Sequence, residues 1–221
     1  DLNRSGLSPY EAPFELSKPA WVWSEPDKHV RRGVFHSSPL LDEANNVYIS
    51  CTNGYVYSLN PQGQLRWEVK LPGTDPGNPA LLNGLLYTAT TSGFAFALDM
   101  SSGAHVWAVK VGMVAPSDTW SAAAGSGTVI VPATGDNWRP EVHRADSPEP
   151  NNGGEEIVAL DAGTGRELWR YKVSERANTI TYNLLPAIVG DSVIFDDFSG
   201  GVYRLSLLDG SETWFAPGPR P

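Results

Sequence analysis

The sequence contains a single cysteine, Cys51, so it cannot form a disulfide within the chain. It has no run of 18 apolar residues, which excludes a membrane-spanning helix. Basic residues are outnumbered by acidic ones, and the formal net charge of −9 argues against a protein that wraps nucleic acid through its phosphates. Long stretches of helical periodicity are missing as well. The remaining composition is typical of one β-rich globular domain.

A repeat runs along the chain and is clearest at residues 157–169, where a strand, a glycine turn and a second strand end in a tryptophan. Successive tryptophans of the repeat are 40, 62 and 45 residues apart, and an insertion of about 20 residues explains the longest step. The period near 40 predicts an all-β fold, a β-propeller of four-stranded antiparallel blades. Four units share a glycine followed four residues later by the tryptophan: Gly63 and Trp67, Gly103 and Trp107, Gly165 and Trp169, and Gly210 and Trp214.

The residue types in the repeat have physical reasons. Glycine supplies the positive φ that a tight hairpin turn needs. Asp161, at the entrance of one such turn, can accept hydrogen bonds from the backbone that follows it. A tryptophan at the same place in every unit is expected to pack between neighbouring blades, with its N–H near backbone carbonyls, rather than to bind a ligand.

We expect an extended arm at residues 1–36, blades over residues 37–216, and a tail at 217–221 that cannot continue a strand ladder. Residues 20–24 of the arm are predicted to form an orphan strand, since Trp23 lies one period (44 residues) before Trp67. This orphan strand favours an open arc over a ring closed with four blades, and the sequence, which begins at Asp1, is expected to be a processed or partial chain. The four blades are predicted at about residues 37–71, 78–111, 119–173 and 183–216.

The pattern Ala-Leu-Asp-x-x-Thr-Gly-x-x-x-Trp at residues 159–169 resembles the tryptophan-docking repeat of the pyrroloquinoline-quinone (PQQ) type β-propellers. The resemblance is weaker in the first and fourth units, where Asn60 and Ser206 replace the aspartate. That family includes quinoprotein alcohol dehydrogenases and non-catalytic outer-membrane assembly lipoproteins of the BamB type, and its rings close with about seven or eight blades. The resemblance therefore implies a partial propeller or a fragment of such a ring, in an extracytoplasmic compartment such as the periplasm or an organelle lumen.

The resemblance also implies a possible cofactor site. Trp120 falls where the dehydrogenases have a tryptophan that stacks on PQQ, and Asp136 or Asn137 falls where they have a ligand of Ca²⁺. The region 173–183 contains no aspartate, although the family places its catalytic base there. The adjacent cysteines that contact the quinone in some members are excluded by the single Cys51. We therefore assign no catalytic residue, and we keep PQQ and Ca²⁺ only for the alternative in which the chain is an enzyme.

Other candidate sites are weaker. The four histidines, at positions 29, 36, 105 and 143, show no metal-ligand spacing. The acidic pairs Asp196-Asp197 and Glu155-Glu156 are expected in solvated turns rather than as paired catalytic carboxylates. Neither a phosphate-binding glycine loop nor a nucleophile elbow is present.

The sequence therefore predicts a non-catalytic PQQ-like propeller that works as a protein-binding scaffold or as a subunit of a larger assembly, with other protein subunits as partners. The alternatives are a PQQ- and Ca²⁺-dependent alcohol or sugar dehydrogenase, or a fragment of one, and a carbohydrate or peptide binder. Tryptophan and arginine are common interface anchors. The predicted contacts are the faces of the end blades, the arm around Trp21 and Trp23, and the long loop at Trp138 and Arg139.

Overall fold

The computed structural model describes residues 17–26, 33–74, 76–112, 121–134, 155–172, 185–197 and 200–218. Within these residues the chain forms four antiparallel sheets of four strands each, and it contains no helix. In every sheet the strands follow one another in chain order, so each sheet is a simple meander. The predicted β-propeller architecture is confirmed, and we number the sheets as blades 1 to 4.

The bounds of the strands follow the predicted repeat. Blade 1 consists of β1 (Leu40–Leu41), β2 (Val47–Ser50), β3 (Tyr55–Leu59) and β4 (Leu65–Lys70). Blade 2 consists of β5 (Ala80–Leu82), β6 (Leu85–Ala89), β7 (Phe94–Asp99) and β8 (His105–Lys110). Blade 3 consists of β9 (Ala123–Gly125), β10 (Thr128–Thr134), β11 (Glu155–Asp161) and β12 (Glu167–Lys172). Blade 4 consists of β13 (Ala187–Val189), β14 (Ser192–Asp196), β15 (Val202–Ser206) and β16 (Glu212–Ala216).

Every blade has the same irregularity in its last hairpin. In blade 1, Ser58 pairs with Trp67 whereas Leu59 pairs with Leu65. Arg66 is therefore an extra, unpaired residue of β4 in this register. The same shift occurs at the third strand of the other three blades. A β-bulge of this kind bends the strand and re-aims its side chains. The bulge therefore fixes the tryptophan in the same relation to the last turn of every blade.

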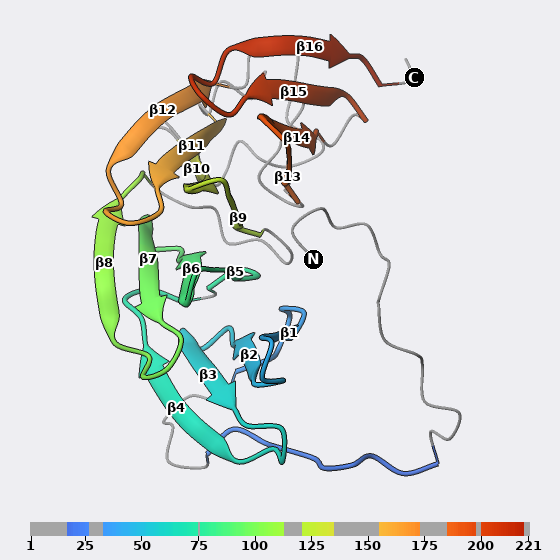
Figure 1. Cartoon of the computed structure of the whole chain (residues 1–221), viewed down its shortest axis with the longest axis vertical. Coiled ribbons are helices and arrows are strands. Elements are labelled where there is room, and N and C mark those ends of the chain that lie inside the picture. Colours follow the sequence, from blue (N-terminus) through green and yellow to red (C-terminus); the bar gives the residue numbers. More distant parts are fainter. Residues whose placement is uncertain are drawn as a thin grey trace, which may run out of the picture.

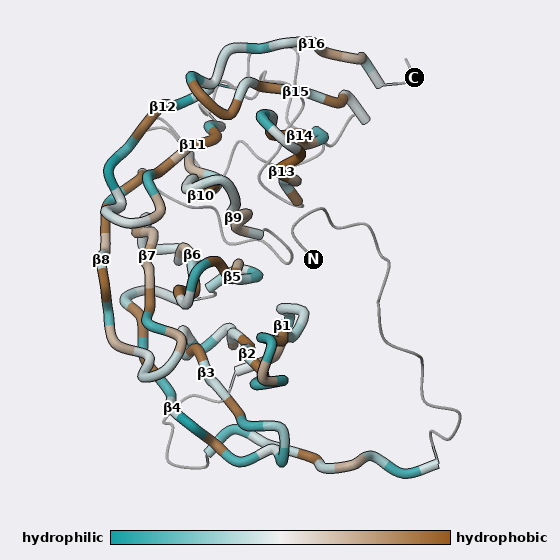
Figure 2. The backbone as a smooth tube through the Cα atoms, viewed as in Figure 1, coloured by the Kyte–Doolittle hydropathy of each residue, from teal (hydrophilic) through white to brown (hydrophobic). Residues whose placement is uncertain are grey.

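The hydrophobic core lies between the blades, in three clusters that each join one blade to the next. Tyr48 and Trp67 of blade 1, for example, pack with Leu86 and Phe96 of blade 2. Two further clusters join blade 2 to blade 3 and blade 3 to blade 4. Figure 2 shows the apolar residues concentrated in the strands and the polar ones mostly in the turns. Because each blade buries its apolar faces only against its neighbours, a blade depends on the blades beside it for stability.

The four blades follow one another around an open arc, with blade 1 at one end and blade 4 at the other (Figure 1). The fourth strands β4, β8, β12 and β16 form the outer rim, and the first strands lie on the inner side. The structure confirms the open arc and excludes a ring closed by these four blades. We call the face of a blade that points to the following blade its front face, and the opposite face its rear face.

The arm differs from its prediction in one respect. Residues 20–24 were expected to form a strand, but none of residues 17–26 belongs to a sheet. The segment forms no ladder of backbone hydrogen bonds with blade 1, and a strand requires such a ladder. The segment instead runs along the end of blade 1 (Figure 1) and contacts it through side chains.

Candidate docking site

The tryptophans of the repeat link each blade to the next. The indole Nε1 of Trp67 donates a hydrogen bond to the carbonyl of Met100 over 3.0 Å, and Trp107 and Trp169 do the same with Ala162 (3.0 Å) and Leu207 (2.9 Å). Each acceptor belongs to the turn between the third and fourth strands of the following blade. These three indoles are 7 to 9% exposed, so their N–H groups need such partners.

The glycine of the same turn completes the contact. Gly103, Gly165 and Gly210 have φ values of 74°, 73° and 72°, which favour glycine over any residue with a side chain. A Cβ added at these positions would also stand 2.6 to 2.8 Å from a ring atom of the preceding blade's tryptophan. Two independent constraints therefore select glycine here. We call the carbonyl and the glycine of such a turn a socket.

An acidic residue holds the socket turn in shape. The Asp161 carboxylate accepts hydrogen bonds from the backbone N and the Oγ1 of Thr164, at 2.9 and 2.7 Å. These bonds, above all the one from the hydroxyl, lower the pKa of Asp161. Asp99 has the same position in blade 2, and in blade 4 Asp209 lies directly before Gly210; both accept hydrogen bonds from neighbouring serines and have lowered pKa values. In blade 1 the uncharged Asn60 takes the same role, with its side-chain oxygen bound to two backbone N–H groups.

The socket of blade 1 is occupied by the chain's own arm. The Trp21 indole donates to the carbonyl of Pro61 over 3.0 Å, and a Cβ on Gly63 would stand 2.5 Å from Trp21 Cδ2. Trp21 therefore fills the place that the period assigned to Trp23. The two residues lie on the same side of an extended segment because they are two positions apart. Spacing alone could not choose between them.

Trp23 and Glu25 extend this contact over the rear face of blade 1. The ring of Trp23 lies edge-on to Tyr57, with 4.9 Å between centroids. The Glu25 carboxylate accepts hydrogen bonds from Asn53 Nδ2 (2.8 Å) and from the backbone N of Gly33 (3.0 Å). Tyr57 is fully buried. The rear face of blade 1 is thus covered by the segment that precedes it.

Cys51 lies under the same cover. Its side chain is buried, and its Sγ is 3.8 Å from Glu25 Oε2. Burial raises the pKa of the Cys51 thiol. Because the chain has only this cysteine, its reactivity reports on whether the arm is in place.

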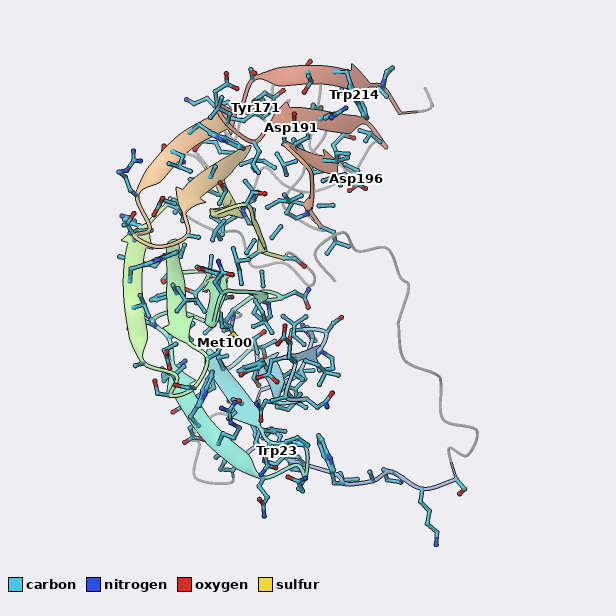
Figure 3. The ribbon with its side chains drawn as sticks, viewed as in Figure 1. Trp23, Met100, Tyr171, Asp191, Asp196 and Trp214 are labelled. Carbon is cyan, nitrogen blue, oxygen red and sulfur yellow. The ribbon has the colours of Figure 1, made fainter. Side chains whose placement is uncertain are left out.

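The opposite end of the arc differs. Trp214, the last tryptophan of the repeat, is 41% exposed, because no described blade follows it. Leu208 and Val189 of the same blade are exposed as well. Figure 3 shows Trp23 and Trp214 at opposite ends of the arc. Among the described residues, the arm covers the end face at blade 1, whereas Trp214, Leu208 and Val189 are exposed at blade 4.

The structure corrects the prediction for one residue of each acidic pair, Asp197 and Glu156. Asp197 is buried and accepts hydrogen bonds from the backbone N of Gly201 (2.8 Å) and from the Tyr203 hydroxyl (3.1 Å), whereas Asp196 is exposed. Glu156 is buried too and forms an ion pair with Arg170. These carboxylates stabilise local structure, because buried charges need such partners. The sequence offers little indication that Asp197 and Glu156 are buried, because acidic pairs between strands are usually solvated.

The other predicted site residues lie outside the described residues: Trp120, Asp136, Asn137, Trp138 and Arg139. Within the described ranges, no group of three or more His, Cys, Asp or Glu residues is placed to hold a metal ion. The same part of the chain also has no helix long and apolar enough to cross a membrane.

Sequence comparison relates the chain to proteins of two kinds. The profile of the family described as outer membrane protein assembly factor BamB matches residues 52–221. The chain is 24% identical over 189 residues to the outer membrane protein assembly factor BamB of Yersinia pestis, covering 80% of this chain and 43% of that protein. It is 25% identical over 187 residues to the polyvinylalcohol dehydrogenase of Sphingopyxis sp., covering 79% of this chain and 24% of that protein. The chain thus spans less than half the length of the curated relatives it matches.

A comparison of structures supports the fold. The quinohemoprotein alcohol dehydrogenase of Comamonas testosteroni superposes with a TM-score of 0.64 at 16% identity, over 84% of this chain and 35% of that one. At this identity the similarity establishes the blade architecture alone. Function has to be argued from the sites on this scaffold.

Proposed function

Since the chain belongs to the family of the outer membrane protein assembly factor BamB, we propose that it is a non-catalytic scaffold that binds other protein subunits in a larger assembly. The family profile covers most of the chain, from residue 52 to residue 221. The tryptophan-docking repeat then serves to build rigid faces for contacts rather than to bind a cofactor. We place the protein outside the cytoplasm, in line with the name of one relative, the outer membrane protein assembly factor BamB.

The observation that carries this proposal is the exposure of Trp214 among the described residues. Trp214 has the position of three buried tryptophans and yet is exposed, and Leu208 is 88% exposed. An exposed tryptophan is a typical anchor of a protein interface. Trp138 and Arg139 are a second proposed contact, because tryptophan and arginine are typical anchors of interfaces. Trp21 and Trp23 contact blade 1, so we propose that their main role is to stabilise that blade.

The test is co-purification of partners with the tagged full chain and three variants. We expect one set of proteins to accompany the wild type, and to be lost or reduced on deletion of residues 139–153 or on Trp214→Ala. The matched control is Val22→Ala, a change at an exposed position on the arm. Thermal unfolding of each variant separates lost binding from lost structure. A deletion that unfolds the chain while association persists would contradict the assignment of the loop.

A second candidate function is a PQQ- and Ca²⁺-dependent alcohol or sugar dehydrogenase, because the chain is also similar to a polyvinylalcohol dehydrogenase. Trp120 and Asp136 or Asn137 are the residues that would contact the cofactors. Titration of the purified chain with PQQ and Ca²⁺ tests this candidate. A saturable quinone spectrum with reduction of an electron-accepting dye, both abolished by Trp120→Ala, would favour the dehydrogenase over the scaffold.

A further inference from the structure

Two asparagines of the described chain stand directly before a glycine, and the fold holds them differently. Asn53-Gly54 lies in the turn between β2 and β3, and Asn83-Gly84 in the turn between β5 and β6. A third pair, at residues 152–153, lies outside the described residues. In an Asn-Gly sequence the backbone N of the glycine can attack the side-chain amide carbon of the asparagine, because no side chain hinders the approach. The reaction at each pair therefore depends on how the fold holds these two groups.

The pair in blade 1 is held at both reacting groups. Asn53 is only 6% exposed, its Nδ2 donates to Glu25 Oε2 over 2.8 Å, and its Oδ1 accepts from the backbone N of Tyr55 over 3.1 Å. The backbone N of Gly54 donates to the carbonyl of Cys51 over 2.8 Å. Attack would break these hydrogen bonds at a covered place, so Asn53 can react only when this part of the blade opens.

The pair in blade 2 is free at both reacting groups. Asn83 and Gly84 are exposed, and a Cβ added to Gly84 would meet no atom within 4 Å. In the described part of the chain, neither the Asn83 side chain nor the backbone N of Gly84 has a hydrogen-bond partner. Their φ values of 51° and 78° are those of the tight hairpin turn that Asn-Gly favours. Rotation of this turn toward the reactive geometry therefore breaks no hydrogen bond of either group.

Blade 3 shows that the turn does not require an asparagine. Ser126 and Gly127, between β9 and β10, have nearly the same φ values, 50° and 75°. A Cβ at Gly127 also meets no atom within 4 Å. Serine has no amide carbon, so Ser126 cannot undergo the reaction. Asn83→Ser is therefore a change that the fold already uses at the equivalent place.

We infer that Asn83 is a site of spontaneous deamidation, which forms isoaspartate in the first hairpin turn of blade 2. The backbone N of Gly84 loses its proton to water and bonds to Cγ of Asn83, while the Cγ–Nδ2 bond breaks and Nδ2 leaves as ammonia with a proton from water. Water then opens the succinimide at either carbonyl and leaves aspartate or isoaspartate at position 83. The sum is a gain of water and a loss of ammonia, without oxidation. The reaction needs no partner, so it holds whether or not the chain is a scaffold.

The turn at Asn83 is joined to the socket of blade 2. The carbonyl of Gly84 accepts a hydrogen bond from the backbone N of Met100 over 2.9 Å, and the carbonyl of Met100 accepts the Trp67 indole N–H. Blade 3 has the same link from its first turn to its socket. Isoaspartate adds a methylene group to the backbone before Gly84 and so displaces the Gly84 carbonyl. Deamidation of this turn should therefore loosen the contact between blades 1 and 2.

Ageing of the purified full chain at mildly alkaline pH tests the site, with tryptic peptides followed by mass spectrometry. In the folded chain, modification at Asn83 is expected to be at least about tenfold faster than at Asn53, because Asn53 must wait for local opening. The matched control is the same incubation in guanidinium chloride, where both pairs are unfolded and should react at similar rates. Equal rates in the folded chain, or an intact Asn83 after a time that converts the denatured chain, overturns the inference.

A variant assigns the product to one residue. Asn83→Ser should abolish the isoaspartate that protein isoaspartyl methyltransferase labels in the tryptic peptide of residues 71–110. Its urea unfolding should match that of the wild type, because Ser126 occupies the same turn of blade 3. Continued labelling of that peptide in Asn83→Ser would place the reaction at another residue and contradict the assignment.

The modified chain, which ion exchange separates by its additional carboxylate, tests the link to the socket. Hydrogen exchange of the Trp67 indole N–H is expected to become about 3- to 30-fold faster, because its acceptor is displaced. Trp169, bound in the socket of blade 4, should exchange at the unmodified rate. The Asn83→Ser chain, aged in the same way, controls for modification elsewhere. Equal exchange at Trp67 in the modified and unmodified chains overturns the link between turn and socket.

Discussion

The indole of Trp169 lies directly against Gly210 in the turn of the next blade, where an added Cβ would stand 2.6 Å from its Cε3. The same indole donates its N–H to the carbonyl of Leu207, three residues before that glycine. The contact of Trp169 therefore requires two properties of this turn: the positive φ of Gly210 and the absence of a side chain at that position. Four changes test how much the arc depends on such contacts.

The first change is Gly210→Ala, compared with Gly190→Ala. Both glycines belong to blade 4 and have positive φ, at 72° and 61°, but a Cβ at Gly190 meets no atom within 4 Å. Each variant is expected to lose about 1–2 kcal/mol from left-handed strain. Gly210→Ala should lose about 1–3 kcal/mol more, because its methyl group overlaps the Trp169 ring. Urea unfolding of both variants gives the difference, and equal losses would show that the indole does not constrain this glycine.

The second change is Trp107→Ala, compared with Trp214→Ala. Trp107 is buried between blades 2 and 3 and bound to Ala162, so its removal should cost about 3–5 kcal/mol. Trp214 is exposed, so its removal should cost less than about 1 kcal/mol. Denaturant titration measures both values. A loss at Trp214 as large as the loss at Trp107 would mean that the front face of blade 4 is already covered.

The third change is Trp21→Ala, read out through Cys51. Loss of the socket contact should loosen the arm by about 1–2 kcal/mol and speed thiol labelling about 5- to 30-fold, provided that labelling proceeds through opening of the arm. Val22→Ala is the control, since that neighbouring side chain is exposed. The rate of reaction with a thiol reagent at neutral pH gives the comparison. If both variants label at the wild-type rate, the arm does not protect Cys51.

The fourth change replaces the three socket aspartates, Asp99, Asp161 and Asp209, by asparagine. Their carboxylates have pKa values below the usual value of about 3.9, because neighbouring hydroxyl and backbone groups donate hydrogen bonds to them. A lowered pKa in the folded state gives stability that is present above pH about 4 and is lost as the pH falls through the folded values. Asparagine accepts similar bonds without titrating, as Asn60 does in blade 1.

The measurement is the unfolding temperature between about pH 6 and pH 2. The wild type should lose stability more steeply than the triple variant below pH about 4, and the two should be similar near pH 6. A triple variant with the same acid slope as the wild type would show that these turns contribute nothing to the acid response.

Much of the fold could be predicted because the information is local. The positive φ of the turn glycines, the alternation of the strands and the period of the tryptophans all act within one blade, and each blade repeats them. The errors have a common origin in longer-range contacts. Trp23 was chosen instead of Trp21 because a two-residue step keeps a side chain on the same face. Asp197 and Glu156 were expected in water because their partners, Tyr203 and Arg170, come from the next strand.

The sequence by itself therefore determined the unit: a four-stranded blade with a glycine turn and a tryptophan. Only the tertiary structure decided which end of the row of blades is covered. Trp21 reaches its socket at Pro61 and Gly63 across some 40 residues, and the exposure of Trp214 depends on whether another sheet lies beside it. Such contacts between separate sheets arise from packing in space, and a repeat read along one chain does not contain them.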